Sequence, residues 1–166
     1  MEARLKNLNV WMWRYFENVR NYSGVNFTAD GTACEILLDV VNTLRAEGSG
    51  AQRTILLKRL DPRDEAKITG GLRFRDYSKL HLKLVDADEA LTCMAATTTG
   101  EVVDLEFTSR YLDQFEKGLR DVLRGRGDYA IGPPDESRAR KQIGTKDKLS
   151  EDLWFWPCFG HLYPVR

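Results

Sequence analysis

The sequence predicts an α+β fold in which a mostly antiparallel sheet carries two amphipathic helices. Residues 31–47 and 109–125 place apolar side chains at the spacing of a helix that buries one face. Several other stretches alternate apolar and polar residues, which is the period of a strand with one buried face. Successive strand patterns in the middle of the chain have no helix between them. We therefore expect hairpins there rather than parallel crossovers.

The most regular stretch, 102–132, predicts a strand, a helix and a second strand. Its first strand alternates acidic residues with Val103, Leu105 and Phe107. The apolar face of the helix consists of Tyr111, Leu112, Phe115, Leu119, Val122 and Leu123. Thr108 and Ser109 offer capping hydroxyls at the start of the helix. Gly125 and Gly127 predict its end, because glycine adopts a positive φ at little cost.

An earlier stretch, 25–57, repeats this order of strand, helix and strand. A shift of 78 residues superposes Val25 on Val103, Phe27 on Leu105, Leu37 on Phe115, Val41 on Leu119 and Leu44 on Val122. Thr32 and Glu35 have the spacing of a capping box at the start of the helix. Two interpretations stay open: a duplication relating 10–59 to 70–131, or the chance alignment of two amphipathic helices that each follow a strand. The small number of identical residues favours chance.

Further strands are expected around these two units. Residues 10–19 fit both a helical stripe and an alternating strand, and their aromatic density favours the strand. A short apolar strand is expected over 54–58. The alternating segment after it breaks at 76–78, which predicts a hairpin. A second hairpin is predicted from strands over 90–97 and 101–107.

Length and composition predict one domain, 1–166, with balanced charge. The chain has 25 basic and 25 acidic residues and a pI near 6.7, so bulk electrostatics do not favour nucleic acid or an anionic membrane. The amino terminus lacks the apolar segment of a signal peptide, and no apolar run is long enough to span a membrane. The three widely spaced cysteines fit a reducing cytoplasm, with Cys34 and Cys93 as small core residues.

A polar segment, 133–151, is predicted to be a long mobile loop. It has almost no apolar residues, and its basic side chains include Arg138 and Arg140. A phosphate-binding flap and a solvated loop both fit such a segment. Nearby acidic residues almost cancel the basic charge, which favours the solvated loop.

The chain closes with an unusually aromatic segment, LWFWPCFGHLYPVR. On a strand, Leu153 and Phe155 point to one face, whereas Trp154 and Trp156 point to the other. A terminal strand packed on the helices or on the amino-terminal aromatic residues explains this pattern most simply. The functional alternative is an aromatic surface or pocket, since tryptophan is enriched at binding hot spots. Trp11, Trp13, Trp154 and Trp156 would share such a site if the two ends of the chain formed neighbouring strands.

The sequence predicts no catalytic residues, no metal site and no cofactor. Its glycine-rich segment GRGDYAIG follows a helix, whereas a dinucleotide-binding loop precedes one. The only histidines are His81 and His161, 80 residues apart by subtraction. His81 is out of phase with its apolar neighbours, so it is expected to be exposed or to line a groove. Cys158 and His161 would point to opposite faces of a strand, which argues against a nucleophilic pair.

The motifs LRGRGDYAIG and DLWFWP, within residues 102–157, resemble small uncharacterised bacterial α+β proteins. This group includes immunity proteins against secreted toxins and orphan products of mobile elements such as integron gene cassettes. It carries no catalytic motif. The resemblance implies a non-enzymatic role in binding a partner or ligand.

Three hypotheses follow. The first is a non-catalytic interaction protein that binds a protein partner or itself, as a homodimer, through the aromatic strand surface. The second is a small-molecule binder or enzyme whose aromatic cleft includes His81 and is covered by loop 133–151. The third, nucleic-acid binding through the basic residues of that loop, has the least support because the net charge is zero.

Overall fold

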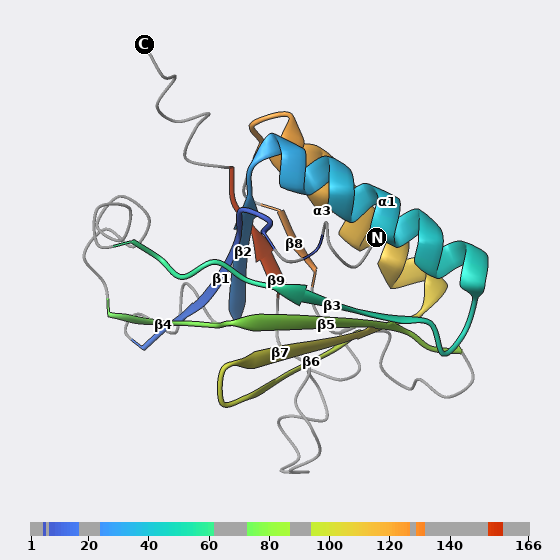
Figure 1. Cartoon of the computed structure of the whole chain (residues 1–166), viewed down its shortest axis with the longest axis horizontal. Coiled ribbons are helices and arrows are strands. Elements are labelled where there is room, and N and C mark those ends of the chain that lie inside the picture. Colours follow the sequence, from blue (N-terminus) through green and yellow to red (C-terminus); the bar gives the residue numbers. More distant parts are fainter. Residues whose placement is uncertain are drawn as a thin grey trace.

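The computed structural model confirms the α+β class (Figure 1). It describes residues 5, 7–16, 24–61, 73–86, 94–126, 129–131 and 153–157. This part of the chain contains two helices, α1 (Gly31–Glu47) and α3 (Ser109–Leu123). Its strands are β1 (Val10–Tyr15), β2 (Val25–Ala29), β3 (Gln52–Leu56), β4 (Phe74–Asp76), β5 (Lys79–Leu84), β6 (Met94–Thr99), β7 (Val102–Phe107), β8 (Tyr129–Ile131) and β9 (Leu153–Phe155).

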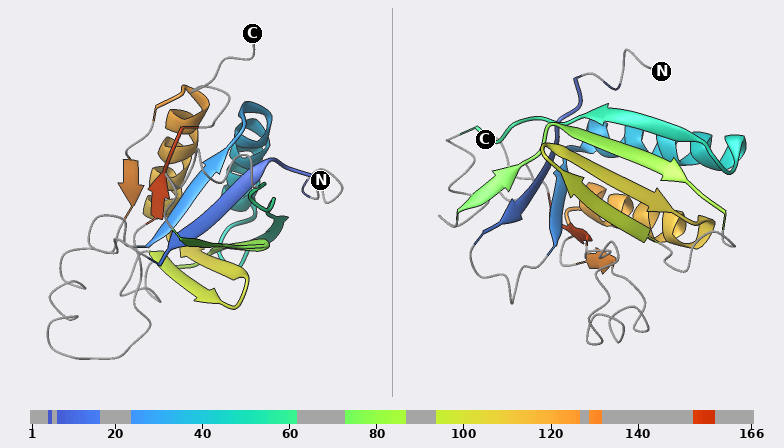
Figure 2. Two further views of the ribbon diagram at one scale, coloured as in Figure 1. Left: turned by 90° about the vertical axis from the view of Figure 1, so that its left-hand side faces the viewer. Right: turned by 90° about the horizontal axis from the view of Figure 1, so that it is seen from below.

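The strands form two sheets rather than the single sheet that the sequence predicted. A five-stranded sheet has the order β4-β1-β2-β9-β8, and a four-stranded sheet has the order β3-β5-β7-β6. Most neighbours are antiparallel, but β2 and β9 are parallel, as are β5 and β7. The two helices lie side by side and pack against the inner faces of both sheets (Figures 1 and 2). Neither helix in the described residues is long and apolar enough to span a membrane.

The predicted hairpin at 76–78 is wrong, because the chain passes there from one sheet into the other. β4 pairs with β1, whereas β5 pairs with β3 and β7. The Tyr77 side chain is only 2% exposed, and its backbone N–H donates to the Met12 carbonyl at 3.1 Å. A hairpin tip would be exposed to solvent, whereas this residue is buried where the two sheets meet.

The other strand predictions hold, with shifted ends. The strand interpretation of 10–19 is confirmed as far as Tyr15, and residues 17–20 lie outside the described part. The strand expected over 54–58 begins two residues earlier and ends at Leu56. The second hairpin is confirmed, since β6 and β7 pair directly and are joined at Gly100, whose φ is 62°; residues 90–93 of its predicted first strand lie outside the described part.

Both helices lie where the sequence predicted them. Asp30, rather than Thr32, caps α1: its Oδ1 accepts a hydrogen bond from the Ala33 N–H at 2.7 Å. Helix α3 ends at residue 123, two residues before its predicted end, and Gly125 follows with a φ of 71°. Thr108 stands at the capping position of α3 without a side-chain capping hydrogen bond.

The core lies between the helices and the inner faces of the sheets. Its centre is a cluster of aromatic rings with centroids 5.1 to 6.1 Å apart, formed by Phe27, Phe107, Phe115 and Phe155. Gly118 lets α3 approach β9, because a Cβ at this position would lie 2.6 Å from the Phe155 ring. Cys34 is a fully buried core residue, as predicted, whereas Cys93 lies outside the described residues.

The two sheets repeat one arrangement. Each contains a hairpin, β1–β2 or β6–β7, whose second strand leads into a helix. Next to that second strand in the sheet lies a parallel strand, β9 or β5. On the far side of this parallel strand lies an antiparallel strand, β8 or β3. If the chain is divided into a first half, 10–84, and a second half, 94–155, the outer pair of each sheet comes from the half that does not supply its hairpin. The repeated order extends beyond the predicted segments 10–59 and 70–131, and a duplication as its origin stays a prediction.

Candidate binding face

The outer face of the five-stranded sheet is the most aromatic surface of the described residues, and we call it the aromatic face. Strand β1 buries Val10 and Met12 in the core, so its alternate residues point to the other side of the sheet. Strand register places the alternate residues of β4, β2 and β9 on the same side. The aromatic face comprises Trp11, Trp13, Tyr15, Asn26, Thr28, Phe74, Asp76, Trp154 and Trp156.

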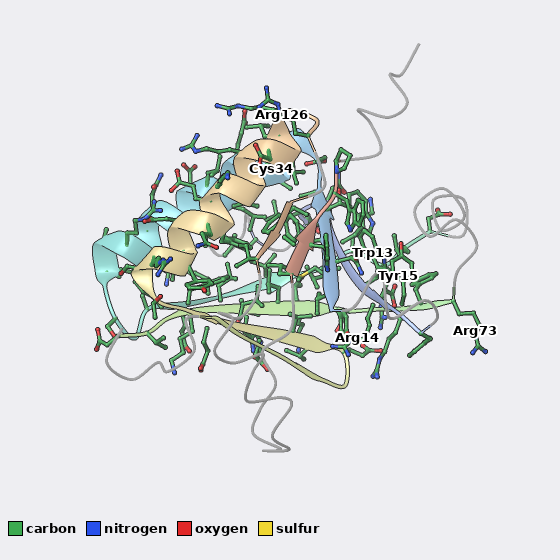
Figure 3. The ribbon with its side chains drawn as sticks, turned by 180° about the vertical axis from the view of Figure 1, so that it is seen from behind. Trp13, Arg14, Tyr15, Cys34, Arg73 and Arg126 are labelled. Carbon is green, nitrogen blue, oxygen red and sulfur yellow. The ribbon has the colours of Figure 1, made fainter. Side chains whose placement is uncertain are left out.

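The part of the aromatic face on β1 is buried. Trp11, Trp13 and Tyr15 are exposed by 8%, 1% and 6%, and they cluster with Leu60. The rings of Trp13 and Tyr15 meet edge to face with centroids 6.3 Å apart. Figure 3 shows both residues on β1, away from the two helices. These three side chains therefore form a floor rather than an accessible surface.

One polar atom in this floor has no hydrogen-bond partner among the described residues. Trp13 Nε1 is buried and makes no hydrogen bond with any described residue. Burial of an unsatisfied N–H costs about 1–3 kcal/mol. The Lys58 ammonium lies 5.6 Å from the centre of the Trp11 ring, within the range of a cation–π contact.

Two buried polar side chains of β2 attach the last strand to this floor. Asn26 and Thr28 are both fully buried. Trp156 Nε1 donates to Asn26 Oδ1 at 2.8 Å, and Asn26 Nδ2 donates to the Trp13 carbonyl at 3.3 Å. Thr28 Oγ1 donates to the Trp156 carbonyl at 3.0 Å. These bonds connect β1, β2 and the end of β9, and they fix the position of the Trp156 ring.

The accessible aromatic side chains of this face are Phe74 and a pair of stacked indoles. Trp154 and Trp156 are partly exposed, whereas Leu153 and Phe155 on the same strand are buried. The two indole rings have centroids 6.3 Å apart and planes 21° apart. A rigid pair of aromatic rings offers a large apolar contact area with little loss of side-chain entropy on binding. The pair therefore suits recognition of another molecule and contains no group for acid–base chemistry.

His81 does not belong to this site. It lies on the outer face of the four-stranded sheet, which we call the charged face, defined by Lys79, His81, Lys83, Asp104 and Glu106. His81 Nδ1 and Asp104 Oδ1 are 2.8 Å apart, with side chains 44% and 40% exposed. Lys83 Nζ and Glu106 Oε1 are 3.4 Å apart. Exposed pairs of this kind contribute little to stability, and this face is a solvated surface.

The structure gathers four of the predicted site residues. Trp11, Trp13, Trp154 and Trp156 share the aromatic face, although β1 and β9 are not adjacent because β2 lies between them. Arg138, Arg140 and the rest of loop 133–151 lie outside the described residues. No group of three or more metal-ligating side chains occurs within the described part of the chain.

Sequence reasoning missed the polar residues Asn26 and Thr28. The signal was present, since both alternate with Val25, Phe27 and Ala29 and must point away from the core. Their complete burial could not be anticipated, because the aromatic rings beside them come from β1 and β9, far apart in sequence.

Searches against protein-family models, curated proteins and solved structures gave no match to this chain. The arguments about function therefore rest on the geometry of the aromatic face.

Proposed function

We propose that this chain is a non-catalytic accessory protein of the bacterial cytoplasm that binds a protein partner through the aromatic face. The stacked and partly exposed pair of Trp154 and Trp156, of which Trp156 packs against the buried tryptophans of β1, is the observation that supports the proposal most strongly. Tryptophan is enriched among the residues that dominate binding energy at protein interfaces.

The hydrogen bonds that hold Trp156 support this proposal further. Trp156 is attached to Asn26 through its indole N–H, and its carbonyl accepts from Thr28. A ring held in this way loses little conformational freedom when a partner covers it.

A matched pair of substitutions tests the proposal. Trp154→Ala removes the outer ring, and His81→Ala removes a partly exposed ring at the equivalent position of the other sheet. A partner captured by the wild-type protein is purified, and its affinity for each variant is measured by calorimetry. We expect Trp154→Ala to weaken binding at least about tenfold, because loss of a hot-spot residue costs about 2 kcal/mol or more, and His81→Ala to leave it unchanged. Equal affinities for the two variants would refute the proposal.

The second candidate is a small-molecule site on the same face. The unsatisfied Trp13 N–H favours it, because a ligand with a hydrogen-bond acceptor could satisfy this group. Tryptophan emission and melting temperature, measured against metabolites that carry carboxylate, phosphate or carbonyl groups, distinguish the candidates. A ligand that raises the melting temperature of the wild type but not of Trp13→Phe would support the small-molecule site.

A further inference from the structure

The edges of the two sheets differ in how they are protected from other strands. Open edges expose unpaired backbone groups, and proteins usually protect them with short strands, charged side chains or proline. Both edges of the five-stranded sheet are short, because β4 and β8 have three residues each. Edge strand β3 carries Arg53, which is paired with Glu47 and donates to the Gln52 carbonyl at 2.7 Å.

Strand β6 has none of these protections. It is the remaining edge, and in the described residues it is paired on one side only, with β7. It has six residues, MAATTT, with no charge, no proline and no glycine. Its register with β7 is continuous over all six positions, so no bulge turns the edge away.

We propose that the edge of β6 pairs in antiparallel orientation with β6 of a second copy of this chain. Two copies of the four-stranded sheet would then form one continuous sheet across a two-fold axis. A two-fold interface places every residue near the axis close to its own copy, so a charged residue there would face a like charge. An uncharged strand is compatible with self-pairing for this reason, and the three other edges are not: β3 and β4 carry charges and β8 is short.

The charged residues nearest to this edge do not oppose the pairing. Asp104 and Glu106 lie on β7, opposite Thr97 and Ala95 of β6. In the paired arrangement two β6 strands separate the β7 strands of the two copies. The carboxylates of one copy would then be about three strand spacings, roughly 14 Å, from those of the other, which exceeds the Debye length at physiological salt.

Thr97→Lys tests the proposal by sedimentation velocity over a wide range of protein concentrations. Position 97 is near the centre of β6 and stands opposite Asp104, so the monomer should accept a cation there. Across the two-fold axis the same cation meets its copy. We expect the wild type to dimerise and the variant to dimerise at least about tenfold more weakly. Thr97→Ser, a neutral control, should dimerise like the wild type, and an equimolar mixture of Thr97→Lys and Thr97→Glu should form a heterodimer.

Several outcomes would overturn the proposal. A wild type that remains monomeric at every concentration would do so, and so would a Thr97→Lys variant that dimerises as well as the wild type. A dimer abolished by Trp154→Ala and retained by Thr97→Lys would place self-association on the aromatic face instead. Hydrogen exchange of the wild type gives a test that needs no variant. The amides of β6 should be protected more strongly as protein concentration rises, and concentration-independent exchange at β6 would contradict the pairing.

Discussion

The outer faces of the two sheets occupy equivalent places in the fold and have opposite chemistry. Beside the central hairpin strand, the five-stranded sheet carries Trp154 opposite Asn26, and the four-stranded sheet carries His81 opposite Asp104. At the first position Trp154 stacks on Trp156, which packs against the buried aromatic cluster, whereas the second is a partly exposed contact between His81 and Asp104. The charged face shows that this strand arrangement does not require aromatic residues outside the core. The architecture therefore does not by itself require these tryptophans, which agrees with the binding role proposed for the aromatic face.

Inside the core, equivalent positions of the two halves differ in side-chain size. The shift of 78 residues relates Gly118 to Val40, and strand register relates Phe155 to Leu82. All four residues are buried. In the second half, Gly118 on the helix packs against the large ring of Phe155 on the strand. In the first half, the equivalent residues Val40 and Leu82 are both of intermediate size. The two halves thus reach similar packing with different side chains, which keeps sequence similarity between them low.

Trp13→Ala should have the largest effect, because it removes the most buried ring of the aromatic floor. We expect a loss of about 3–5 kcal/mol in the free energy of unfolding, as for other buried large-to-small changes. His81→Ala on the charged face should change it by less than about 0.5 kcal/mol. Urea denaturation of both variants measures the contrast. Trp13→Phe should retain most of the stability, since it removes the unsatisfied N–H; a loss equal to that of Trp13→Ala would show that the indole N–H has a partner.

Asn26→Ala should have the next largest effect. It leaves the Trp156 indole N–H without its acceptor and removes a donor from the Trp13 carbonyl. We expect a loss of about 1–3 kcal/mol, because the Trp13 carbonyl bond is buried and the Trp156 indole bond is partly buried. Asp104→Ala, the equivalent change on the charged face, should cost less than about 0.5 kcal/mol, because solvent replaces the lost partner. Thermal denaturation compares the stabilities of the two variants. Similar losses of stability would mean that Asn26 and Asp104 are equally accessible to solvent.

Gly118→Ala should destabilise the protein although alanine favours helices by up to about 1 kcal/mol over glycine. The new methyl group would overlap the Phe155 ring, and overpacking of this kind costs about 1–3 kcal/mol. Phe155→Leu, which copies the arrangement of the other half, should recover part of the loss in the double variant. Gly31→Ala is the control, because its nearest atom, Leu123 Cδ1, is 3.6 Å away from the added Cβ. Additive losses in a double-mutant cycle of Gly118→Ala and Phe155→Leu would contradict direct packing.

Local patterns predicted the helices and most strands, whereas contacts distant in sequence decided how they assemble. The apolar periodicity around Leu37 and Phe115 was sufficient to place both helices. The break near Tyr77 has the composition of a turn, and only its burial between two sheets shows that it is a crossing point. The alternation of Trp154 with Phe155 predicted which rings leave the core. It could not show that Trp13 is covered, because the residues around that ring come from other strands.

Glu116→Gln should have the smallest effect, and it tests the contact that joins the two halves through their helices. Hydrogen bonds from Arg120 and then from Arg45 of α1 lower the pKa of the Glu116 carboxyl below its ordinary 4.5. A carboxyl with a lowered pKa stabilises the folded state above its unfolded pKa, and this contribution disappears as the pH falls through the folded pKa. The variant should therefore be less stable than the wild type at neutral pH, by up to about 1 kcal/mol, and equally stable in acid. Melting temperatures at neutral and acidic pH measure this difference, with Glu106→Gln on the charged face as a control expected to change little. A difference between Glu116→Gln and the wild type that persists in acid would assign the effect to packing of the side chain rather than to its charge.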